Sequence, residues 1–408
     1  MNQRPKILIV DDEPFNVDYL EQELEDLDYD TLSAANGREA LAQTAAGSPD
    51  VVLLDVMMPE LDGFQVLERL KADKNTRNIP VIIISALNDL RSVVRGIELG
   101  AEDYLPKPFD PVLLKARLGA CLEKKRLRDQ EQLYLKGLER ELEIGRQIQA
   151  DFLPDKLPQP AGWEIAARFE AAREVAGDFY DAFSLLRGER IGLVVGDVCG
   201  KGVGAALFMT LFRSLIRAAS NVAYFTGRLE LSAPLSAATG QQHTLDDAAT
   251  LQNTVTLTNN YVAQTHSRAL KFATLFFGLL DPVTGSLVYL NCGNEPPLIL
   301  SPTGVKTSLE PTGPVVGLFP GINFGIQVTH LEPGDILLAF TDGVTDALNP
   351  TQEMFSREKL LSLLNQPASS STALLDHIEA NLRAHIAGAD QYDDITMLAV
   401  RRTPLAKA

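Results

Sequence analysis

The sequence is poor in cysteine and in positive charge, and each shortage argues against a class of protein. Its three cysteines, Cys121, Cys199 and Cys292, are too far apart for a disulfide framework or a zinc knuckle, which favours a reducing, cytoplasmic setting. Acidic residues number 54 against 37 basic ones, and the formal net charge is -17. Such a chain is a poor candidate for binding a phosphate backbone, so we expect no nucleic-acid partner.

Long hydrophobic runs are also missing. No continuous apolar run approaches the ~18 residues that a membrane-spanning helix needs, so we expect no membrane partner. The first residues lead directly into an apolar strand of about six residues, which is shorter than the core of a signal peptide. The chain has 408 residues, of which 45% are hydrophobic, and is long enough for two or more cores. We therefore expect a soluble, cytoplasmic protein of several domains.

Residues 1–122 show the pattern of a doubly wound α/β domain. Short apolar runs at 7–10, 51–54, 81–84 and, more weakly, 104–105 alternate with stretches of helical periodicity. Near-continuous apolar strands between helices are typical of a parallel sheet that is covered on both faces. We predict a five-stranded parallel sheet here. The predicted helices lie near 14–27, 37–46, 62–73, 89–99 and 110–122.

Five polar side chains stand where the strands of this domain end. They are Asp11, Asp12, Asp55, Ser85 and Lys107. The carboxyl ends of parallel strands share one edge of the sheet, and ligands bind at that edge. We therefore expect three carboxylates, a hydroxyl and an ammonium to gather in one acidic pocket.

This set of side chains suits phosphoryl transfer to an aspartate. Oxygen ligands from Asp11 or Asp12, together with Asp55, are what a hard divalent cation such as Mg²⁺ requires. The Asp55 carboxylate can then attack an incoming phosphoryl group as a nucleophile. The cation and the ammonium of Lys107 neutralise the charge that develops on the transferred oxygens.

Two further residues make this pocket a candidate switch. Ser85 can hydrogen-bond the new phosphate, and the Tyr104 ring can follow it inward. On these residues and motifs, the segment resembles the receiver domain of response regulators over its whole length. The matching residues are Asp12, Asp55, Ser85, Tyr104 and Lys107. The resemblance implies a histidine kinase as partner and a cis bond between Lys107 and Pro108.

Residues 123–153 form a predicted helical linker, rich in Glu, Lys, Arg, Gln and Leu, which ends before Pro154. An apolar stripe runs along it at Leu127, Tyr134, Leu138, Leu142, Ile148 and Phe152. Two steps of four residues break a strict heptad repeat, so the stripe fits a coiled coil with a stutter. The segment is either a single solvated connector or a helix that pairs two copies into a homodimer.

Residues 154–408 mix strands and helices without strict alternation, which favours an α+β domain with largely antiparallel sheets. Predicted strands lie at 163–171, 190–198, 273–281, 285–292, 296–300, 335–341 and 395–400. Predicted helices lie near 201–219, 246–267 and 373–387. Residues 220–245 lack clear periodicity and are rich in Ala, Ser, Thr and Gly, so we expect a mobile surface insertion there.

Acidic residues recur in this domain in short motifs that we interpret as tight, glycine-flanked turns. They are Asp178, Asp181, Asp197, Asp342, Asp393 and Asp394. Separated carboxylates without a histidine or cysteine partner point to Mg²⁺ or Mn²⁺ rather than zinc. A pair of such metals suits the hydrolysis of a phosphate ester by an activated water. Neither a Ser–His–Asp set nor a phosphate-binding loop of an ATPase competes with this interpretation.

These motifs, together with Glu143–Gln149, Ala172–Asp178 and Gly293–Pro297, resemble the PPM family of metal-dependent phosphatases in its bacterial sigma-regulatory branch. The resemblance implies a β-sandwich flanked by helices and two Mn²⁺ or Mg²⁺ ions. It implies that Asp178 and Asp197 bind or bridge the metal pair. By the same resemblance, Val198 lends a backbone carbonyl, Asp342 and Asp393 bind one metal, and Asp181 and Asp394 follow through water.

The sequence thus predicts a response regulator whose phosphorylation on Asp55 controls a serine/threonine protein phosphatase. The family resemblance suggests a phosphorylated anti-sigma-factor antagonist as the substrate. An alternative is a binding adaptor that sequesters a partner without catalysis, which would predict lost metal ligands. A DNA-binding factor would require a basic helix-turn-helix module, and residues 123–408 offer none.

Overall fold

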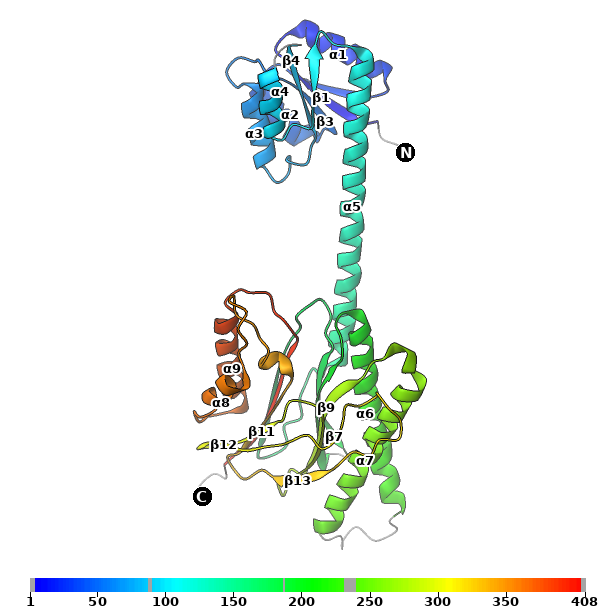
Figure 1. Ribbon diagram of the computed structural model, residues 1–408, viewed down its shortest axis with the longest axis vertical. Coiled ribbons are helices and arrows are strands. Elements are labelled where there is room, and N and C mark those ends of the chain that lie inside the picture. The colour runs from blue at the N-terminus through cyan, green and yellow to red at the C-terminus, as the bar shows by residue number, and fades with distance from the viewer. Residues whose placement is uncertain (1–3, 87–89, 186–187, 231–239, 405–408) are drawn as a thin grey trace. The chain divides into compact units, whose positions relative to one another are not determined.

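The computed structural model describes residues 4–86, 90–185, 188–230 and 240–404. The chain forms two compact units, Met1–Glu139 and Arg140–Ala408. Figure 1 shows a small α/β unit that contains the N-terminus and a larger unit of two sheets flanked by helices.

The first unit is built on a five-stranded parallel sheet in the order β2-β1-β3-β4-β5, as predicted. Its strands are β1 Lys6–Val10, β2 Asp30–Ala34, β3 Val51–Asp55, β4 Val81–Ala86 and β5 Asp103–Lys107. Four of them coincide with the apolar runs of the sequence. The exception is β2, an edge strand with a single fully buried residue, which therefore has little apolar pattern.

Helices cover both faces of this sheet because alternate strand residues point to opposite sides. Ile7, Ile9 and Leu53 pack against α1 (Pro14–Asp26) and the start of α5 (Pro111–Phe152). The intervening strand residues pack against α2 (Gly37–Gly47) and α3 (Gly63–Ala72) on the other face. Helix α4 is Leu90–Glu98. The order of strands and helices places the carboxyl ends of β1, β3, β4 and β5 along one edge.

Helix α5 is a single element of 42 residues that starts within the receiver-like unit and ends at Phe152, before Pro154. The predicted domain boundary at residue 122 falls inside it. Its middle and end leave large apolar side chains in solvent: Leu127, Leu133, Tyr134, Leu135, Leu138, Ile144 and Ile148. Four residues of the predicted stripe are exposed: Leu127, Tyr134, Leu138 and Ile148. The other two, Leu142 and Phe152, are half-buried.

The second unit is a sandwich of two antiparallel five-stranded sheets, as the resemblance implied. The first sheet has the order β13-β10-β9-β8-β7 and the second has the order β12-β11-β14-β15-β6. The first comprises β7 Asp178–Leu185, β8 Arg190–Val198, β9 Ala273–Leu280, β10 Ser286–Cys292 and β13 Gln327–His330. The second comprises β6 Trp163–Glu170, β11 Leu298–Ser301, β12 Gly304–Ser308, β14 Ile336–Phe340 and β15 Ile395–Arg402. Apolar side chains such as Leu193, Phe276 and Leu398 fill the space between the sheets.

Two pairs of helices flank the sandwich (Figure 1). Helices α6 (Val203–Glu230) and α7 (Gly240–Thr265) share a core with the first sheet. Helices α8 (Arg357–Leu363) and α9 (Ser371–Ile386) share one with the second sheet. The expected mobile insertion at 220–245 is wrong for residues 220–230 and 240–245, which extend α6 and α7. Residues 231–239 lie outside the described part of the chain.

Within α6, the stretch Val203–Ala223 is long and apolar enough to cross a membrane by length and composition alone. The sequence expectation overlooked it because a few polar residues interrupt the apolar ones. Met209, Phe212 and Ile216 from this stretch are buried in the core that α6 shares with the first sheet. A helix that packs its apolar side chains into a protein core has the same length and composition as one that crosses a membrane.

Candidate functional site

The first site lies at the carboxyl edge of the parallel sheet. Asp11 follows β1, Asp55 ends β3 and Lys107 ends β5, and the ammonium of Lys107 joins the two carboxylates. Its Nζ lies 2.9 Å from Asp11 Oδ2 and 3.0 Å from Asp55 Oδ2. The ligand oxygens of Asp11, Asp12 and Asp55 lie within 4.8 Å of one another. The structure therefore brings together the three carboxylates and the ammonium that the sequence singled out.

Burial and charge oppose each other in this pocket. Burial raises the pKa of Asp55, and the hydrogen bond and positive charge of Lys107 offset part of that rise. Burial alone would lower the pKa of Lys107, but its hydrogen bonds to Asp11 and Asp55 leave that pKa raised. Lys107 therefore stays charged, and one ammonium faces three carboxylates. A hard divalent cation with oxygen ligands fits this excess of negative charge.

Ser85 and Tyr104, the predicted switch residues, lie on the neighbouring strands β4 and β5. Ser85 is buried, and its Oγ has no hydrogen-bond partner within the described residues. Buried hydroxyls are seldom left unpaired, so an unpaired one favours a ligand as its partner. The Ser85 hydroxyl can donate to an oxygen that enters the pocket. The ring of Tyr104 is half-buried, and the Arg117 guanidinium lies over it at 4.8 Å from the ring centre.

Two supporting residues of this pocket were missed from the sequence. Asn16 Nδ2 donates to both carboxylate oxygens of Asp11, at 3.0 and 3.1 Å, and so fixes its orientation. Gly63 opens α3 against the end of β3, where a Cβ would lie 2.1 Å from the carbonyl oxygen of Asp55. The side chain of Asp62 caps the same helix through the backbone N–H of Gln65. The Lys107–Pro108 bond is cis, as the resemblance implied.

The second site begins with a pair of carboxylates on neighbouring strands. Asp178 starts β7 and lies directly opposite Asp197 of β8 in the antiparallel ladder. Side chains in such a pair have Cβ atoms about 4.5–5.5 Å apart, so the two carboxylates are neighbours. Asp178 Oδ2 accepts hydrogen bonds of 2.6 Å from the hydroxyls of Thr341 and Thr396. The interpretation of Asp178 as a turn residue is wrong, since it starts a strand, whereas Asp197 lies within the strand predicted at 190–198.

Two more carboxylates reach this pair from the second sheet. Asp342 opens the short 3₁₀ helix η3 (Asp342–Val344), and Asp393 lies in the loop before β15. These two segments touch at Gly343, where a Cβ would lie 1.9 Å from the carbonyl oxygen of Asp394. The carboxylate of Asp394 accepts the backbone N–H groups of Ala172 and Gly177, at 2.8 and 2.7 Å. It therefore anchors the segment that leads into β7.

Val198, the predicted backbone ligand, is buried at the end of β8. The segment before β7 passes close to it because residue 177 is glycine. A Cβ on Gly177 would lie 2.8 Å from the carbonyl oxygen of Val198 and 3.3 Å from Asp197 Oδ1. The carbonyl of Val198 thus belongs to the immediate surroundings of the carboxylate cluster.

The cluster is electrostatically unfavourable without a cation. Burial and the neighbouring Asp197 raise the pKa of Asp178 well above its ordinary value. Burial and the charges of Asp342 and Asp393 raise the pKa of Asp197 to about 7. Burial and Asp393 raise the pKa of Asp342 to about 6. Buried carboxylates that repel one another, with no histidine or cysteine among them, fit Mg²⁺ or Mn²⁺.

Asp181 does not join this cluster, contrary to the expectation from the sequence. It lies three residues after Asp178 on β7, and successive side chains of a strand point to opposite faces. Its carboxylate pairs with Arg213 and Arg217 of α6, each at 3.0 Å. Asp181 therefore attaches α6 to the sheet and has no carboxylate oxygen aimed at the cluster.

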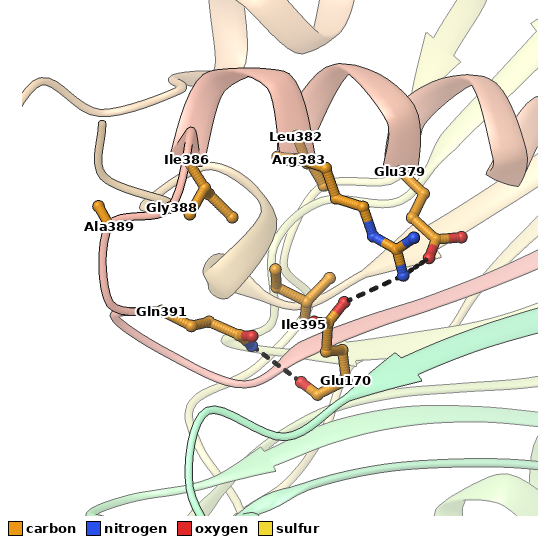
Figure 2. Close-up of a pocket in the computed structure, with 9 residues that line it drawn as sticks. All are labelled: Glu170, Glu379, Leu382, Arg383, Ile386, Gly388, Ala389, Gln391 and Ile395. Atoms are coloured by element: carbon orange, nitrogen blue, oxygen red, sulfur yellow. Dashed lines mark hydrogen bonds and ion pairs between the residues drawn. The ribbon is translucent and has the colours of Figure 1, made fainter. Parts of the chain in front are cut away.

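The loop that carries Asp393 is bonded to the end of β6 through its own residue Gln391, and Figure 2 shows this bond. Gln391 Nε2 donates to the carbonyl oxygens of Glu170 and Asp393, at 3.0 and 2.9 Å. Arg383 lies between the carboxylates of Glu379 and Glu170, at 2.5 and 3.9 Å. Gln391 therefore fixes the loop to β6, and Arg383 joins α9 to the same strand.

The two units together define the class of the protein: a response regulator that joins a receiver domain to a phosphatase domain of the PPM type. Residues 7–119 match the family model of the response regulator receiver domain. Residues 187–403, more than half of the chain, match the model of stage II sporulation protein E. The chain therefore belongs to the stage II sporulation protein E family and carries a receiver domain at its N-terminal end.

Curated relatives share parts of this arrangement. Protein IcfG of Synechocystis sp. is 48% identical over 264 residues, which are 64% of this chain and 41% of that protein. Response regulator PleD of Caulobacter vibrioides is 48% identical over 113 residues, which are 28% of this chain and 25% of that protein. The chain thus spans less than half the length of either relative. The SiaA-PP2C domain of Pseudomonas aeruginosa is 20% identical with a TM-score of 0.49, covering 66% of this chain and 98% of that structure.

Proposed function

We propose that this chain is a phosphorylation-controlled protein phosphatase. A histidine kinase phosphorylates Asp55, and the receiver (1–122) then controls the phosphatase domain (154–408) through the helical linker (123–153). The phosphatase domain hydrolyses phosphoserine or phosphothreonine in a protein. The observation that carries this proposal is the buried carboxylate cluster, in which Asp197 has a pKa of about 7 and Asp342 one of about 6.

In the phosphatase domain, Asp178, Asp197, Asp342, Asp393 and the Val198 carbonyl would hold two Mn²⁺ or Mg²⁺ ions. When bound, such ions supply an activated water and stabilise charge on the phosphoryl oxygens. The protein itself contributes orientation. The hydroxyls of Thr341 and Thr396 occupy one oxygen of Asp178 and leave the other for a ligand. Every ligand of the proposed site is present, which favours catalysis over the adaptor alternative.

In the receiver, Asp11, Asp12 and Asp55 would hold one Mg²⁺, and an oxygen of Asp55 would attack phosphorus while the kinase histidine leaves. Lys107 already lies against Asp55, where it can neutralise the arriving phosphoryl group. The unpaired Oγ of Ser85 can donate to one phosphoryl oxygen. Movement of Ser85 toward the phosphate frees space that the Tyr104 ring can enter, and this coupling is the proposed switch.

The physiological substrate that we propose is a phosphorylated anti-sigma-factor antagonist in the cytoplasm. The support is the resemblance of the motifs around Asp178, Asp197 and Asp342 to the sigma-regulatory branch of the PPM family. This choice of substrate is tested by comparing the rate of phosphate release from a phosphorylated antagonist protein with the rate from an unrelated phosphoprotein. Equal rates on both would contradict this choice of substrate and leave the phosphatase activity itself in place.

The experiment that tests the phosphatase is hydrolysis of p-nitrophenyl phosphate with Mn²⁺, with and without beryllofluoride as a mimic of phosphorylated Asp55. We expect activity in the wild type, a loss of at least about 100-fold in Asp197→Asn, and a changed rate with beryllofluoride. Asp390→Asn is the matched control, because Asp390 is an exposed acid of the loop that also carries Asp393. A wild type that is inactive in every state would favour the adaptor.

A further inference from the structure

A lysine in the loop between β8 and α6 forms an ion pair with the acidic cluster. Lys201 stands between Gly200 and Gly202, whose φ values of 88° and 76° form a turn that residues with a Cβ rarely adopt. Its Nζ lies 2.9 Å from Asp393 Oδ2 and also donates to the carbonyl oxygen of Tyr392. The same Nζ lies over the Tyr392 ring, 4.5 Å from its centre. One ammonium therefore makes three contacts with the loop before β15.

Lys201 differs from the nearby Lys271 in its partner, because Lys201 pairs with a carboxylate of the cluster and Lys271 bonds a backbone carbonyl. Lys271 Nζ donates to the carbonyl oxygen of Cys199, at 2.7 Å, and thus supports the turn from below. Over the described ranges of the chain, Lys201 is the one lysine or arginine that forms an ion pair with a carboxylate of the cluster. The carboxylates compared are Asp178, Asp197, Asp342, Asp393 and Asp394.

An ammonium on Asp393 has a direct consequence for any cation that uses the same carboxylate. Two cations that share one carboxylate repel each other, and the repulsion is stronger in a partly buried site than in water. Lys201 and Asp393 keep only about a third of their side-chain surface exposed, 34% and 30%. Solvent therefore screens the competition only in part, and the ammonium has to leave or share Asp393 when a divalent cation arrives.

We propose that Lys201 is a positioning residue that competes with the divalent cation for Asp393 and thereby weakens metal binding at this side of the cluster. The proposal rests on the proposed function, since it assigns Asp393 to the metal. In this arrangement the chain carries its own monovalent counter-ion. The affinity for the metal then depends on how firmly the turn at Gly200–Gly202 holds the lysine against the loop.

The loop keeps its position without Lys201, because its other anchor is independent. Gln391 holds the loop to the end of β6 through the Glu170 carbonyl, and Figure 2 shows this bond, which does not involve Lys201. The backbone N–H of Asp394 also donates to Asp393 Oδ1, which orients the carboxylate locally. Removing the charge at residue 201 should therefore free Asp393 Oδ2 for a cation while the carboxylate stays in place.

The test is isothermal titration calorimetry of Mn²⁺ into the full chain at pH 7.5, for wild type, Lys201→Met and Lys201→Arg. We expect Lys201→Met to bind the weaker Mn²⁺ equivalent about tenfold more tightly, because an ion pair and a cation–π contact no longer compete. Lys201→Arg keeps the charge and should stay close to the wild-type affinity. A merely structural role of Lys201 would leave the affinity unchanged or lower it.

Lys271→Met is the matched control, since it removes the same charge from a lysine beside this turn that does not pair with Asp393. An affinity that rises equally in Lys201→Met and Lys271→Met would reduce the effect to net charge and overturn the proposal. Unchanged or weaker binding in Lys201→Met would overturn it as well, while the proposed phosphatase stands. A wild type that binds no Mn²⁺ would overturn both, and so the two failures can be told apart.

Discussion

Asp55 and Asp197 are both buried carboxylates, but their neighbours differ in charge. Asp55 has the ammonium of Lys107 at 3.0 Å, which stabilises its ionised form. Asp197 faces the carboxylates of Asp342 and Asp393, which add to the effect of burial. The phosphatase cluster is therefore the less stable of the two sites when no divalent cation neutralises it, and this difference can be measured.

We predict that Asp197→Asn stabilises the metal-free protein at neutral and higher pH. The pKa of Asp197 is about 7 in the folded protein against an ordinary value of 3.8. The folded state therefore binds this proton more tightly, and stability falls as the pH rises from about 4 to about 7. The asparagine variant lacks this loss and should gain roughly 2–4 kcal/mol at pH 8.

The measurement is thermal unfolding in EDTA at pH 5 and pH 8. The gain should be larger at pH 8, and the exposed Asp390→Asn should show none at either pH. An equal gain at both values, or a less stable variant at pH 8, would contradict the electrostatic argument. A stable Asp197→Asn protein also makes the loss of its phosphatase activity interpretable.

The charged residues of the two sites could be predicted from their motifs in the sequence. The residues that orient them through hydrogen bonds or ion pairs could not. The carboxylates of both sites were predicted because an Asp beside a glycine, or at the end of a strand, is recognisable from the local sequence as a candidate metal ligand. The hydroxyls of Thr341 and Thr396 lie 163 and 218 residues from Asp178, so nothing local connects them to it. Lys201 was in view within its glycine turn, but its partner Asp393 is 192 positions further along the chain.

At the scale of elements, two glycines at helix positions show how different the demands of this fold are. Gly63 starts α3 where a Cβ would meet the Asp55 carbonyl at 2.1 Å, whereas a Cβ on Gly137 in α5 would meet nothing within 4 Å. Glycine costs about 0.5–1 kcal/mol against alanine inside a helix, unless something forbids a side chain. The same substitution should therefore have opposite signs at the two positions.

We predict that Gly137→Ala raises stability by about 0.5–1 kcal/mol, whereas Gly63→Ala lowers it by about 1–3 kcal/mol. The second variant should also accept phosphate from acetyl phosphate more slowly, because the end of β3 that carries Asp55 has to shift. Thermal unfolding by circular dichroism and a phosphate-affinity gel are the measurements. Destabilisation by Gly137→Ala would mean that α5 has a partner at that position.

Elements with a strong pattern were predicted, and the exposed edge strands with a weak pattern were not. The runs at 7–10 and 190–198 are apolar because their strands are covered on both faces. Strands β12 (Gly304–Ser308) and β13 (Gln327–His330) are mostly exposed edge strands, so their sequences carry little alternation. Strand β7 was hidden by the acidic residues that we interpreted as turns. A short sequence motif cannot tell a buried ligand on a strand from a capping residue in a loop.

At the scale of the whole molecule, the open question is what covers the apolar side chains of α5. Tyr134 and Leu138 lie one helical turn apart on the predicted stripe and are 68% and 39% exposed. Monomeric proteins rarely leave such a row in water, and helices with apolar stripes pair through them. We therefore propose a homodimer in which α5 pairs with its counterpart in a second copy.

We predict that sedimentation velocity shows a dimer for the wild type and a monomer for Leu138→Lys, since a lysine in the stripe would be buried without a partner. Gln132→Lys is the control, because it adds the same charge outside the stripe, about 120° around the helix from Leu138. Beryllofluoride should shift the equilibrium if the receiver acts through pairing. Monomers in both states of the wild type would end the dimer hypothesis.

The continuity of α5 has a consequence for how such a chain can be rebuilt. Each residue added to an α-helix turns everything beyond it by about 100°, and seven residues restore the original direction nearly completely. A graft of another receiver onto Pro111–Phe152 therefore has a phase as well as a length. Joints that differ by one or two residues point the apolar row to a different side. Joints that differ by seven keep it, so exchange of modules along this helix proceeds in steps of two turns.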